Sequence, residues 1–466
     1  MSLATVRLSR RDVSAFELSH RAGEPVAEED PAPADAEGHE SLSEEEDENK
    51  MPTKLALCIG AIQIFMSYFS FSIVIPTSYS YARTFNPPAG FPSAGILVGA
   101  ASAGSALVQP LYRFLVARSF AGALYLQCLC MFFGSVLYAV ARLAGSLNMV
   151  VIGRMITGLG ATTYPVLVFC SEHVGKRHRS NVMSWCLGVA RSLGYSLGPI
   201  FAAVLVYVDF RVGELTVDKD SNPGWVIAIA SVLQMSLVAY GFPRQGSRLV
   251  NRRRAEPSAS VAAAAPPRST KEKWLHGLTL FYFIFACFAG PVVICAWEMS
   301  ATDIVQNVFG WSIQSSALLV GGMIFTTLFV LPLVGKLSYR ILDVKIERYG
   351  LLICLGSMLG LFDYVGWEDK PWTTLLPYML FSFLLINAIT VAVTQHYSHV
   401  SKVTDVHLHE PMQMGMNIVG FFSRGVGSVA GDFLSPNALG ALMTALLATM
   451  AALNICLTKQ LKPKGL

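Results

Sequence analysis

Three arginines lie deep inside long apolar stretches of the sequence. Arg154 follows the first glycine of GRMITGLGATTYPVLVFC, Arg191 lies within GVARSLGYSLGP, and Arg424 lies within FFSRGVGSVAGDF. A guanidinium keeps its charge at physiological pH, and turning one toward lipid costs several kcal/mol. We therefore expect all three to face the protein interior or a water-filled cavity. Inward guanidinium groups suit an anion, which they hold through paired N–H donors.

These arginines allow structural roles as well as binding. Arg154 could bond only to backbone carbonyls of a neighbouring helix, although charges inside a membrane are more often functional. Arg191 and Arg424 occupy similar places in the two halves of the chain, so together they could line a positive central cavity. They could instead pair as gates with Glu298, in CAWEMSATDIVQNVFGW, or with Asp432.

Four carboxylates lie at predicted helix ends. Glu298 ends the predicted seventh helix and Asp432 the eleventh, near the predicted non-cytosolic surface, where either could accept a proton or form a gate. A solvated helix end is the alternative for Asp432. Glu172 and Asp343 lie at predicted cytosolic ends, where we expect them to form salt bridges of an inner gate. The basic residues near them are Lys176, Arg177 and Arg340.

Other motifs offer little chemistry. QHYSHVSKVTDVHLHEP holds four of the nine histidines, but it lacks cysteine and a fixed geometry, so we interpret it as a polar cytosolic connector rather than a metal site. His396, still inside the predicted tenth helix, is kept as a candidate proton carrier. RGVGSVAG follows no strand and is not a nucleotide loop. We predict no enzyme, no cofactor and no metal.

Glycines near the arginines predict close helix contacts. Gly158 and Gly160 follow Arg154 in the fourth predicted helix, and Gly427 and Gly431 form a small-xxx-small face in the eleventh. In the fifth, Gly194, Gly198 and Pro199 follow Arg191. The list of gating or packing candidates is therefore Glu172, Asp343, Asp432, Gly158, Gly160, Gly194, Gly198 and Pro199.

The elements that position these residues are membrane helices. The chain is 53% hydrophobic and 14% charged, and apolar stretches of about 20 residues, the length that crosses a bilayer, recur along it. We predict an all-α polytopic membrane protein with twelve spans in two pseudo-symmetric six-helix halves. The first six lie near 55–79, 94–114, 121–143, 147–172, 182–208 and 223–242. The other six lie near 274–297, 313–335, 349–367, 372–398, 413–434 and 437–457.

The remaining segments are polar. Residues 1–50 predict a disordered acidic tail, 243–273 a flexible cytosolic linker between the halves at 51–242 and 274–458, and 459–466 a basic tail. Lysines and arginines concentrate in alternate loops, which predicts that both termini are cytosolic. The basic residues lie at membrane edges, so we expect the lipid bilayer and no nucleic acid as partner, and a monomer.

Two six-helix halves joined by a cytosolic linker are the plan of the major facilitator superfamily, with its substrate site near the midplane between the halves. Arg154, Gly158 and Gly160 resemble its fourth-helix RxxxGxG signature, in which the arginine is associated with substrate or proton coupling. Gly194, Gly198 and Pro199 resemble its fifth-helix glycine–proline motif, which implies a packing and bending element between the halves.

Residues 51–457 further resemble one branch, the membrane part of SPX-major facilitator vacuolar phosphate transporters and their lysosomal anion-conducting relatives. GRMITGLGA, WEMSATDIVQNVFGWS, VGKLSYRILDVK and RGVGSVAGD carry this resemblance. It implies an anion transporter or channel of a vacuolar or lysosomal membrane. Two features depart from it: an acidic tail replaces the SPX domain, and Thr163, Leu167 and Val168 stand where the plant proteins carry extra arginines.

We therefore expect a carrier that moves a small solute, with an anion as the favoured class, by alternating access. Arg154, Arg191, Arg424 and Glu298 are the expected residues for substrate binding or coupling, with a proton as a candidate coupling ion. An anion channel, or a scaffold or receptor without transport activity, are the alternatives.

Overall fold

The computed structural model describes residues 51–175, 182, 188–247, 250–251, 270–337, 340–364, 371–403, 409–458 and 460–461. The predicted acidic tail, most of the linker and most of the C-terminal tail lie outside this part of the chain. Lys176 and Arg177, the expected inner-gate partners of Glu172, also lie outside it.

The described chain is almost wholly helical, because in lipid a helix satisfies its own backbone N–H and C=O groups. The first half contains α2 (Lys54–Ser72), α3 (Ile75–Arg83), α4 (Ser93–Leu107), α5 (Gln109–Arg118), α6 (Phe120–Val140), α7 (Leu147–Gly160), α8 (Tyr164–His173), α10 (Ala190–Leu205) and α11 (Asn222–Gly241). The second half contains α13 (Thr270–Asp303), the π-helix η2 (Ile304–Val308), α14 (Ile313–Phe325), α15 (Thr327–Leu337), α16 (Asp343–Met358), α17 (Pro371–Val403), α18 (His409–Phe433) and α19 (Pro436–Cys456).

Each of the twelve predicted spans has a helix or a broken pair of helices as its counterpart among the described residues. By length and composition, 8 helices could cross a membrane, or up to 9 if the bent pair α4 and α5 is one span. The spans that do not meet this criterion include α10 and α16, which have 16 residues each. The all-α polytopic architecture is thus confirmed.

Several predicted spans are broken rather than continuous. The second bends by 46° between α4 and α5, beside Pro110 at the start of α5, because proline removes a helical hydrogen bond and clashes with the preceding turn. The fourth stops at Gly160 and resumes at Tyr164, just before Pro165. Carbonyls at this second break accept hydrogen bonds from polar side chains of neighbouring helices. Ser105 Oγ donates to Gly158 O at 2.8 Å, and Gln127 Nε2 donates to Thr162 O at 2.6 Å.

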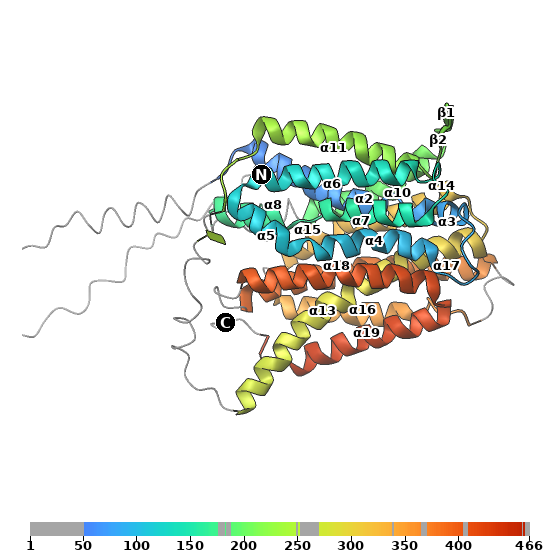
Figure 1. Ribbon diagram of the computed structural model, residues 1–466. Coiled ribbons are helices and arrows are strands. Elements are labelled where there is room, and N and C mark those ends of the chain that lie inside the picture. The colour runs from blue at the N-terminus through green and yellow to red at the C-terminus, as the bar shows by residue number, and fades with distance from the viewer. Residues whose placement is uncertain are drawn as a thin grey trace, which may run out of the picture. The chain divides into compact units, whose positions relative to one another are not determined.

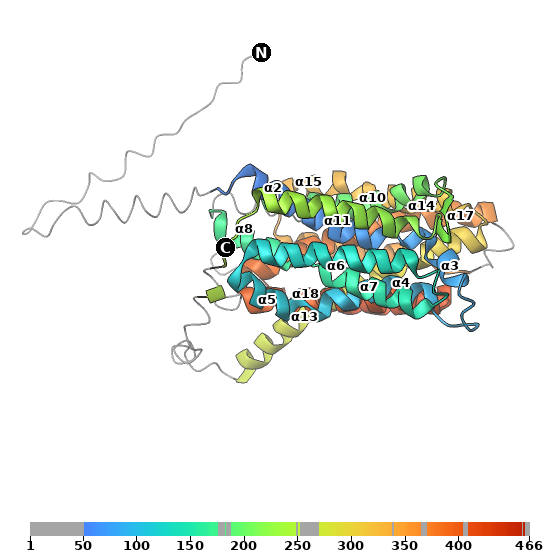
Figure 2. The same cartoon turned by 45° about the horizontal axis from the view of Figure 1, so that its top comes forward.

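The two halves lie side by side, and α4 and α10 of the first pack against α18 and α14 of the second (Figure 1). Within the halves, α10 packs on α2 and α18 packs on α13. Figure 2 shows the same helices from a second direction. One end of the bundle carries α3, η2 and a short hairpin of β1 (Phe210–Val212) and β2 (Leu215–Val217), and we call it the α3 end. The hairpin was not predicted.

The start of the predicted linker is held by hydrogen bonds. Phe120 N donates to Gln245 O at 3.0 Å, and Ser247 N donates to Val116 O at 2.8 Å. Residues 243–247 thus fold back onto the turn between α5 and α6, so the first part of this connector is more ordered than its polar composition predicts.

Candidate functional site

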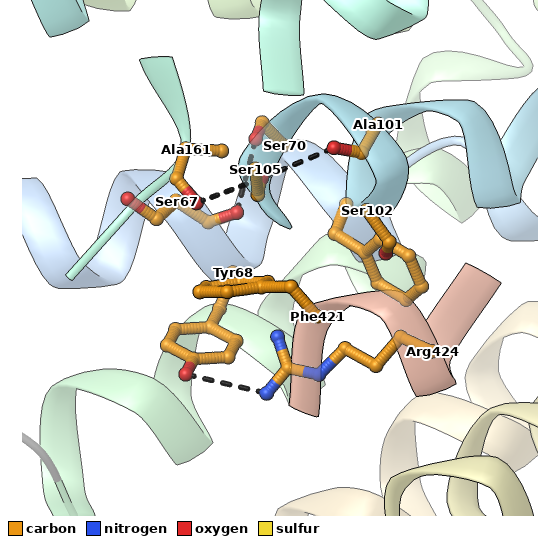
Figure 3. A pocket seen from close by; sticks show the side chains of 10 residues that line it. Ser67, Tyr68, Ser70, Ala101, Ser102, Ser105, Ala161, Phe421 and Arg424 are labelled. Atoms are coloured by element: carbon orange, nitrogen blue, oxygen red, sulfur yellow. Dashed lines mark hydrogen bonds between the residues drawn. The ribbon is translucent and has the colours of Figure 1, made fainter. Parts of the chain in front are cut away.

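A small cavity lies between the two halves, beside the break between α7 and α8. It is lined from the first half by Ser67, Tyr68, Ser70, Phe71, Ala101, Ser102, Ser105 and Ala161, and from the second half by Phe421 and Arg424. Figure 3 shows these side chains around the guanidinium of Arg424. The cavity volume is about 10 Å³, which is room for roughly one water molecule. The two halves must therefore separate before this place can hold a larger molecule.

Arg424 is bound to the aromatic wall of this cavity. Its Nη2 donates to the Tyr68 hydroxyl at 3.3 Å, and its Cζ lies 4.8 Å from the ring centre of Tyr68 and 4.9 Å from that of Phe421. A cation over an aromatic face is stabilised by the ring quadrupole, more strongly where water is excluded. Arg424 is only 8% exposed. No carboxylate among the described residues lies at ion-pair distance from it. The contacts with Tyr68 and Phe421 thus stabilise a buried positive charge.

Arg191, in α10 of the first half, approaches the same tyrosine. Its Cζ lies 5.2 Å from the Tyr68 ring centre, and the ring of Tyr195, one turn along α10, packs on Tyr68 at 4.9 Å. Arg424 also lies 5.6 Å from the Tyr195 ring. The structure thus brings the second and third sequence-predicted arginines together around one tyrosine.

The two arginines have the same local sequence pattern. Arg191 precedes Gly194 and Gly198 by three and seven residues, and Arg424 precedes Gly427 and Gly431 by the same intervals. A Cβ on Gly194 would lie 2.5 Å from Phe65 O of α2, and a Cβ on Gly427 would lie 2.5 Å from Val292 O of α13. Positions i, i+3 and i+7 share one face of a helix, so each arginine lies on the face that its glycines pack against the neighbouring helix.

The glycine–proline motif of α10 has divided roles. Gly198 packs against α2, where an added Cβ would lie 2.0 Å from Ser72 Oγ. Pro199 instead faces the other half, because its Cβ lies 3.3 Å from the Cβ position of Gly321 in α14. Only the proline therefore contacts across the interface, whereas the two glycines pack within their own half.

Glu298 is buried, and its expected position at the end of the seventh predicted helix is wrong. The helix was predicted to end at 297, but α13 continues to Asp303 and η2 to Val308. Glu298 is 1% exposed, and its Oε2 has no hydrogen-bond partner in the described structure. Arg424 and Arg191 both act on it electrostatically. It forms no ion pair with either, so the predicted salt-bridge gate with Glu298 is absent from the described residues.

Arg154 is placed apart from the other two arginines. It is 1% exposed in α7, its Nη1 donates to Ser70 O at 2.9 Å, and its Nε donates to Leu97 O at 3.4 Å. Its Nη2 has no partner among the described residues. Ser70 lines the cavity, so Arg154 lies behind the cavity wall and joins α7 to α2 and α4 through backbone carbonyls.

Asp432 connects the halves at the α3 end. Its Oδ2 accepts from Gly95 N at 2.7 Å, in the first turn of α4, where free N–H groups and the helix dipole favour a carboxylate. Gln306 Nε2 donates to Pro76 O at 3.1 Å and Tyr79 Oη donates to Met299 O at 3.4 Å across the same seam. Asp432 is half-buried, so it is a bridging carboxylate rather than a solvated helix end.

The two predicted inner-gate carboxylates lie at the opposite end. Glu172 accepts from Ser247 Oγ at 2.7 Å, which ties α8 to the start of the linker. Asp343 is buried in the first turn of α16. Their predicted partners Lys176 and Arg177 lie outside the described residues, whereas Arg340 is described and exposed.

The remaining predicted glycines allow neighbouring helices to approach closely without a clash. A Cβ on Gly158 would lie 1.9 Å from Ala101 O of α4, and one on Gly160 would lie 2.3 Å from Gln127 O of α6. Backbone contact at this distance is open only to glycine. Both positions thus lie where neighbouring helices approach through backbone atoms.

Sequence reasoning missed the aromatic and serine residues that complete the cavity. Four of them lie within five positions of α2: Ser67, Tyr68, Ser70 and Phe71. The signal was available, because hydroxyl groups three or four residues apart in an apolar helix share a face and need an interior partner. Their proximity to Arg424, more than three hundred residues away in sequence, carried no local signal.

These features define a two-half membrane carrier with a buried polar centre. The chain belongs to the Major Facilitator Superfamily, because the model of that family matches residues 60–407, more than half of its length. This family and fold are those of carriers rather than enzymes.

Relatives in other organisms match parts of the chain. An SPX domain-containing membrane protein of Arabidopsis thaliana is 26% identical over 217 residues, 47% of this chain and 30% of that protein. The match thus spans less than a third of the plant protein. An uncharacterized MFS-type transporter of Schizosaccharomyces pombe is 22% identical over 306 residues, 61% of this chain and 59% of that protein.

Solved structures share the fold over most of their length. A D-xylose–proton symporter superposes with a TM-score of 0.69 at 14% identity, over 85% of this chain and 96% of that chain. A bacterial homologue of the human lysosomal transporter Spinster, in an inward-facing and occupied conformation, superposes with a TM-score of 0.63 at 12% identity, over 88% and 98%. The chain is therefore a membrane transporter of this fold, and its substrate is a separate question.

Proposed function

We propose that this transporter moves a small anion across an internal membrane, and that the anion binds between Arg191 and Arg424. The observation that carries the proposal is the meeting of two guanidinium groups from opposite halves around Tyr68. Neither is neutralised by an ion pair within the described residues. An anion between them would replace ring contacts with charge-assisted hydrogen bonds, which are roughly twice as strong as neutral ones.

The interface supports alternating access. Asp432 with Gly95, and Gln306 with Pro76, close the two halves at the α3 end. With the termini in the cytosol, as the loop charges predict, this conformation is closed to the non-cytosolic side. Opening that end requires these bonds to break, and it would expose Arg191 and Arg424 to the other compartment.

The choice of an internal membrane rests on resemblance. The relatives include SPX domain-containing membrane proteins, and the solved structures of this fold include a homologue of a lysosomal transporter. We extend this location to the present chain as part of the proposal, together with monomeric function and cytosolic termini.

Flux in proteoliposomes tests the anion site. Purified full-length protein is reconstituted, and uptake of phosphate, chloride and succinate is measured with and without a pH gradient. We expect saturable uptake of one anion. Arg191→Ala and Arg424→Ala should each lower apparent affinity or rate by about 10- to 100-fold, because a lost charge-assisted bond is worth about 1.5–3 kcal/mol.

The matched control is Arg118→Ala, which removes an exposed arginine that packs on Phe114 at one end of the bundle. It should transport as the wild type does. Flux that never saturates would favour a channel. Absence of flux for all three anions, from protein that is monodisperse and folded, would contradict the proposal and favour another solute or a scaffold.

A further inference from the structure

A buried acid–base pair lies in the second half, away from the cavity lining. Glu347 of α16 and His396 of α17 are 0% and 1% exposed, and His396 Nδ1 lies 2.9 Å from Glu347 Oε1. The ninth span is predicted to begin at 349, two residues after Glu347, whereas α16 begins six residues earlier at Asp343. Titratable groups so deep in a membrane protein are costly and mark functional sites by default.

The hydrogen bonds around the pair have fixed directions. His396 Nε2 lies 3.1 Å from Phe283 O, and a carbonyl only accepts, so Nε2 carries a proton. Asn454 Nδ2 donates to Tyr282 Oη at 3.0 Å, so the Tyr282 hydroxyl in turn donates a hydrogen bond to Glu347 Oε1 at 2.5 Å. Arg348 Nε donates to Asn454 Oδ1 at 3.1 Å and fixes the orientation of that amide.

These directions leave one variable proton. The contact between Nδ1 and Oε1 needs a proton on one of its two atoms, because otherwise the carboxylate faces a nitrogen lone pair. With that proton the pair is neutral overall, and without it the pair carries a buried negative charge. Releasing the proton is therefore expensive unless positive charge comes close, so occupancy of this site follows the charge of its surroundings.

The surroundings connect the pair to the central arginines. The described titratable and charged groups packed against it are Tyr282 and Cys287 of α13, Arg348 of α16 and Tyr397 of α17, while α19 contributes the neutral Asn454. Cys287 lies beside His396, and Tyr397 is influenced by Cys287, Arg191 and Arg424. Cys287 thus interacts with both His396 and Tyr397, and Tyr397 interacts electrostatically with the two arginines of the proposed anion site.

We propose that Glu347 and His396 bind the coupling proton of transport. This inference rests on the proposed anion carrier function and adds the coupling ion and its place. An anion bound between Arg191 and Arg424 offsets their positive charge and thereby favours a proton on the pair. The bound proton in turn favours the anion, since linkage between two sites is reciprocal. Anion and proton then cross together, as a symporter requires.

Two transport assays separate this inference from the proposed function. For the anion that the wild type moves, among phosphate, chloride and succinate, one assay measures accumulation driven by a pH gradient. The other measures exchange of that anion at equal concentration and equal pH on both sides. Glu347→Gln should lower accumulation at least tenfold and keep exchange within about twofold. Arg424→Ala should lose both, because it lacks the anion site.

Glutamine keeps the shape of Glu347 and can still accept from Tyr282, and His396→Gln provides a second variant in case the first does not fold. Lys345→Gln, at an exposed position of the same helix, is the control and should resemble the wild type. Accumulation unchanged in Glu347→Gln and His396→Gln would overturn the inference. Loss of both accumulation and exchange in folded Glu347→Gln would also overturn it, because the pair would then be structural or part of anion binding.

Infrared difference spectroscopy gives a readout that needs no substrate. A pH titration of the purified full-length wild type should show a titrating carboxyl signal that is missing in Glu347→Gln and moved along the pH axis in His396→Gln. If the wild type moves none of the three anions, the proposed function fails and this titration still decides whether the pair binds a proton. Identical titrations in the wild type and Glu347→Gln would overturn the inference.

Discussion

Arginines with the same sequence surroundings have different roles once their neighbours are known. Arg154, Arg191 and Arg424 all lie in glycine-rich apolar helices. Arg191 and Arg424 face aromatic rings at the seam between the halves, where the halves must part during transport. Arg154 instead bonds to carbonyls of α2 and α4 inside one half. Because these partners belong to the same half as Arg154 and move with it, Arg154 holds the helices of that half together.

The contacts of Arg154 predict a loss of stability when it is replaced. Arg154→Leu keeps much of the volume but leaves Ser70 O and Leu97 O without their donor. We expect it to lower the free energy of unfolding by about 1–3 kcal/mol, the cost of leaving a buried polar group without its hydrogen-bond partner. Thermal unfolding of the purified protein in detergent measures this, with Arg118→Leu as the exposed control. An unchanged melting temperature combined with lost transport would show that Arg154 serves the substrate instead.

Helices in this protein are shaped by glycine and proline at the points where elements touch or break. Gly158 allows α7 to contact α4 through backbone atoms, and Pro110 and Pro165 follow the breaks in the second and fourth spans. Ser105 and Gln127 donate to the carbonyls of Gly158 and Thr162 at the second break, and Gln109 donates to the Thr162 hydroxyl. The break therefore adds no unsatisfied carbonyl at Gly158 or Thr162, and it brings Ala161 to the cavity wall.

Helix contact at Gly158 predicts a steep response to side-chain size. Gly158→Val should prevent α4 and α7 from packing, because even the first carbon would lie 1.9 Å from Ala101 O. We expect most of the protein to aggregate on size-exclusion chromatography, a cost above about 3 kcal/mol. Gly322→Val, at a helical glycine of α14 with no atom within 4 Å of the added carbon, is the control. Monodisperse, stable Gly158→Val would contradict the packing seen here.

The whole molecule is held in one state by contacts between its halves at the α3 end. Gly95 and Gly99 of α4 meet Ser428 and Gly425 of α18 through backbone atoms, and Asp432 bonds to the start of α4. Close packing of this kind opens as a unit rather than by degrees. The α3 end is therefore expected to be a gate with two positions.

Blocking this closure predicts a transporter arrested with its α3 end open. In Gly95→Leu the added carbon alone would lie 2.6 Å from Ser428 O, so α4 and α18 cannot come together. We expect transport to fall at least tenfold while the melting temperature changes little, since each half keeps its own core. Hydrogen exchange should rise in the first turns of α4. Gly356→Leu, with open space around it, is the control, and normal transport by Gly95→Leu would show that closure takes another form.

The sequence by itself determined the number and type of the spans and the inward direction of the three arginines, because the bilayer imposes both apolar length and the exclusion of charge. Only the tertiary structure decided which arginines meet. The cost of a charge in lipid shows that Arg191 and Arg424 face inward, but not that helices hundreds of residues apart are neighbours.

The same limit explains why the sequence did not predict the burial of Glu298 and Glu347. Hydropathy ends a predicted span at its first polar residues, whereas α13 and α16 extend past them and bury both carboxylates. A carboxylate can be buried when neighbouring helices supply charges or donors, such as Arg424 for Glu298 and Tyr282 for Glu347. Those partners come from other helices, so only their packing could reveal them.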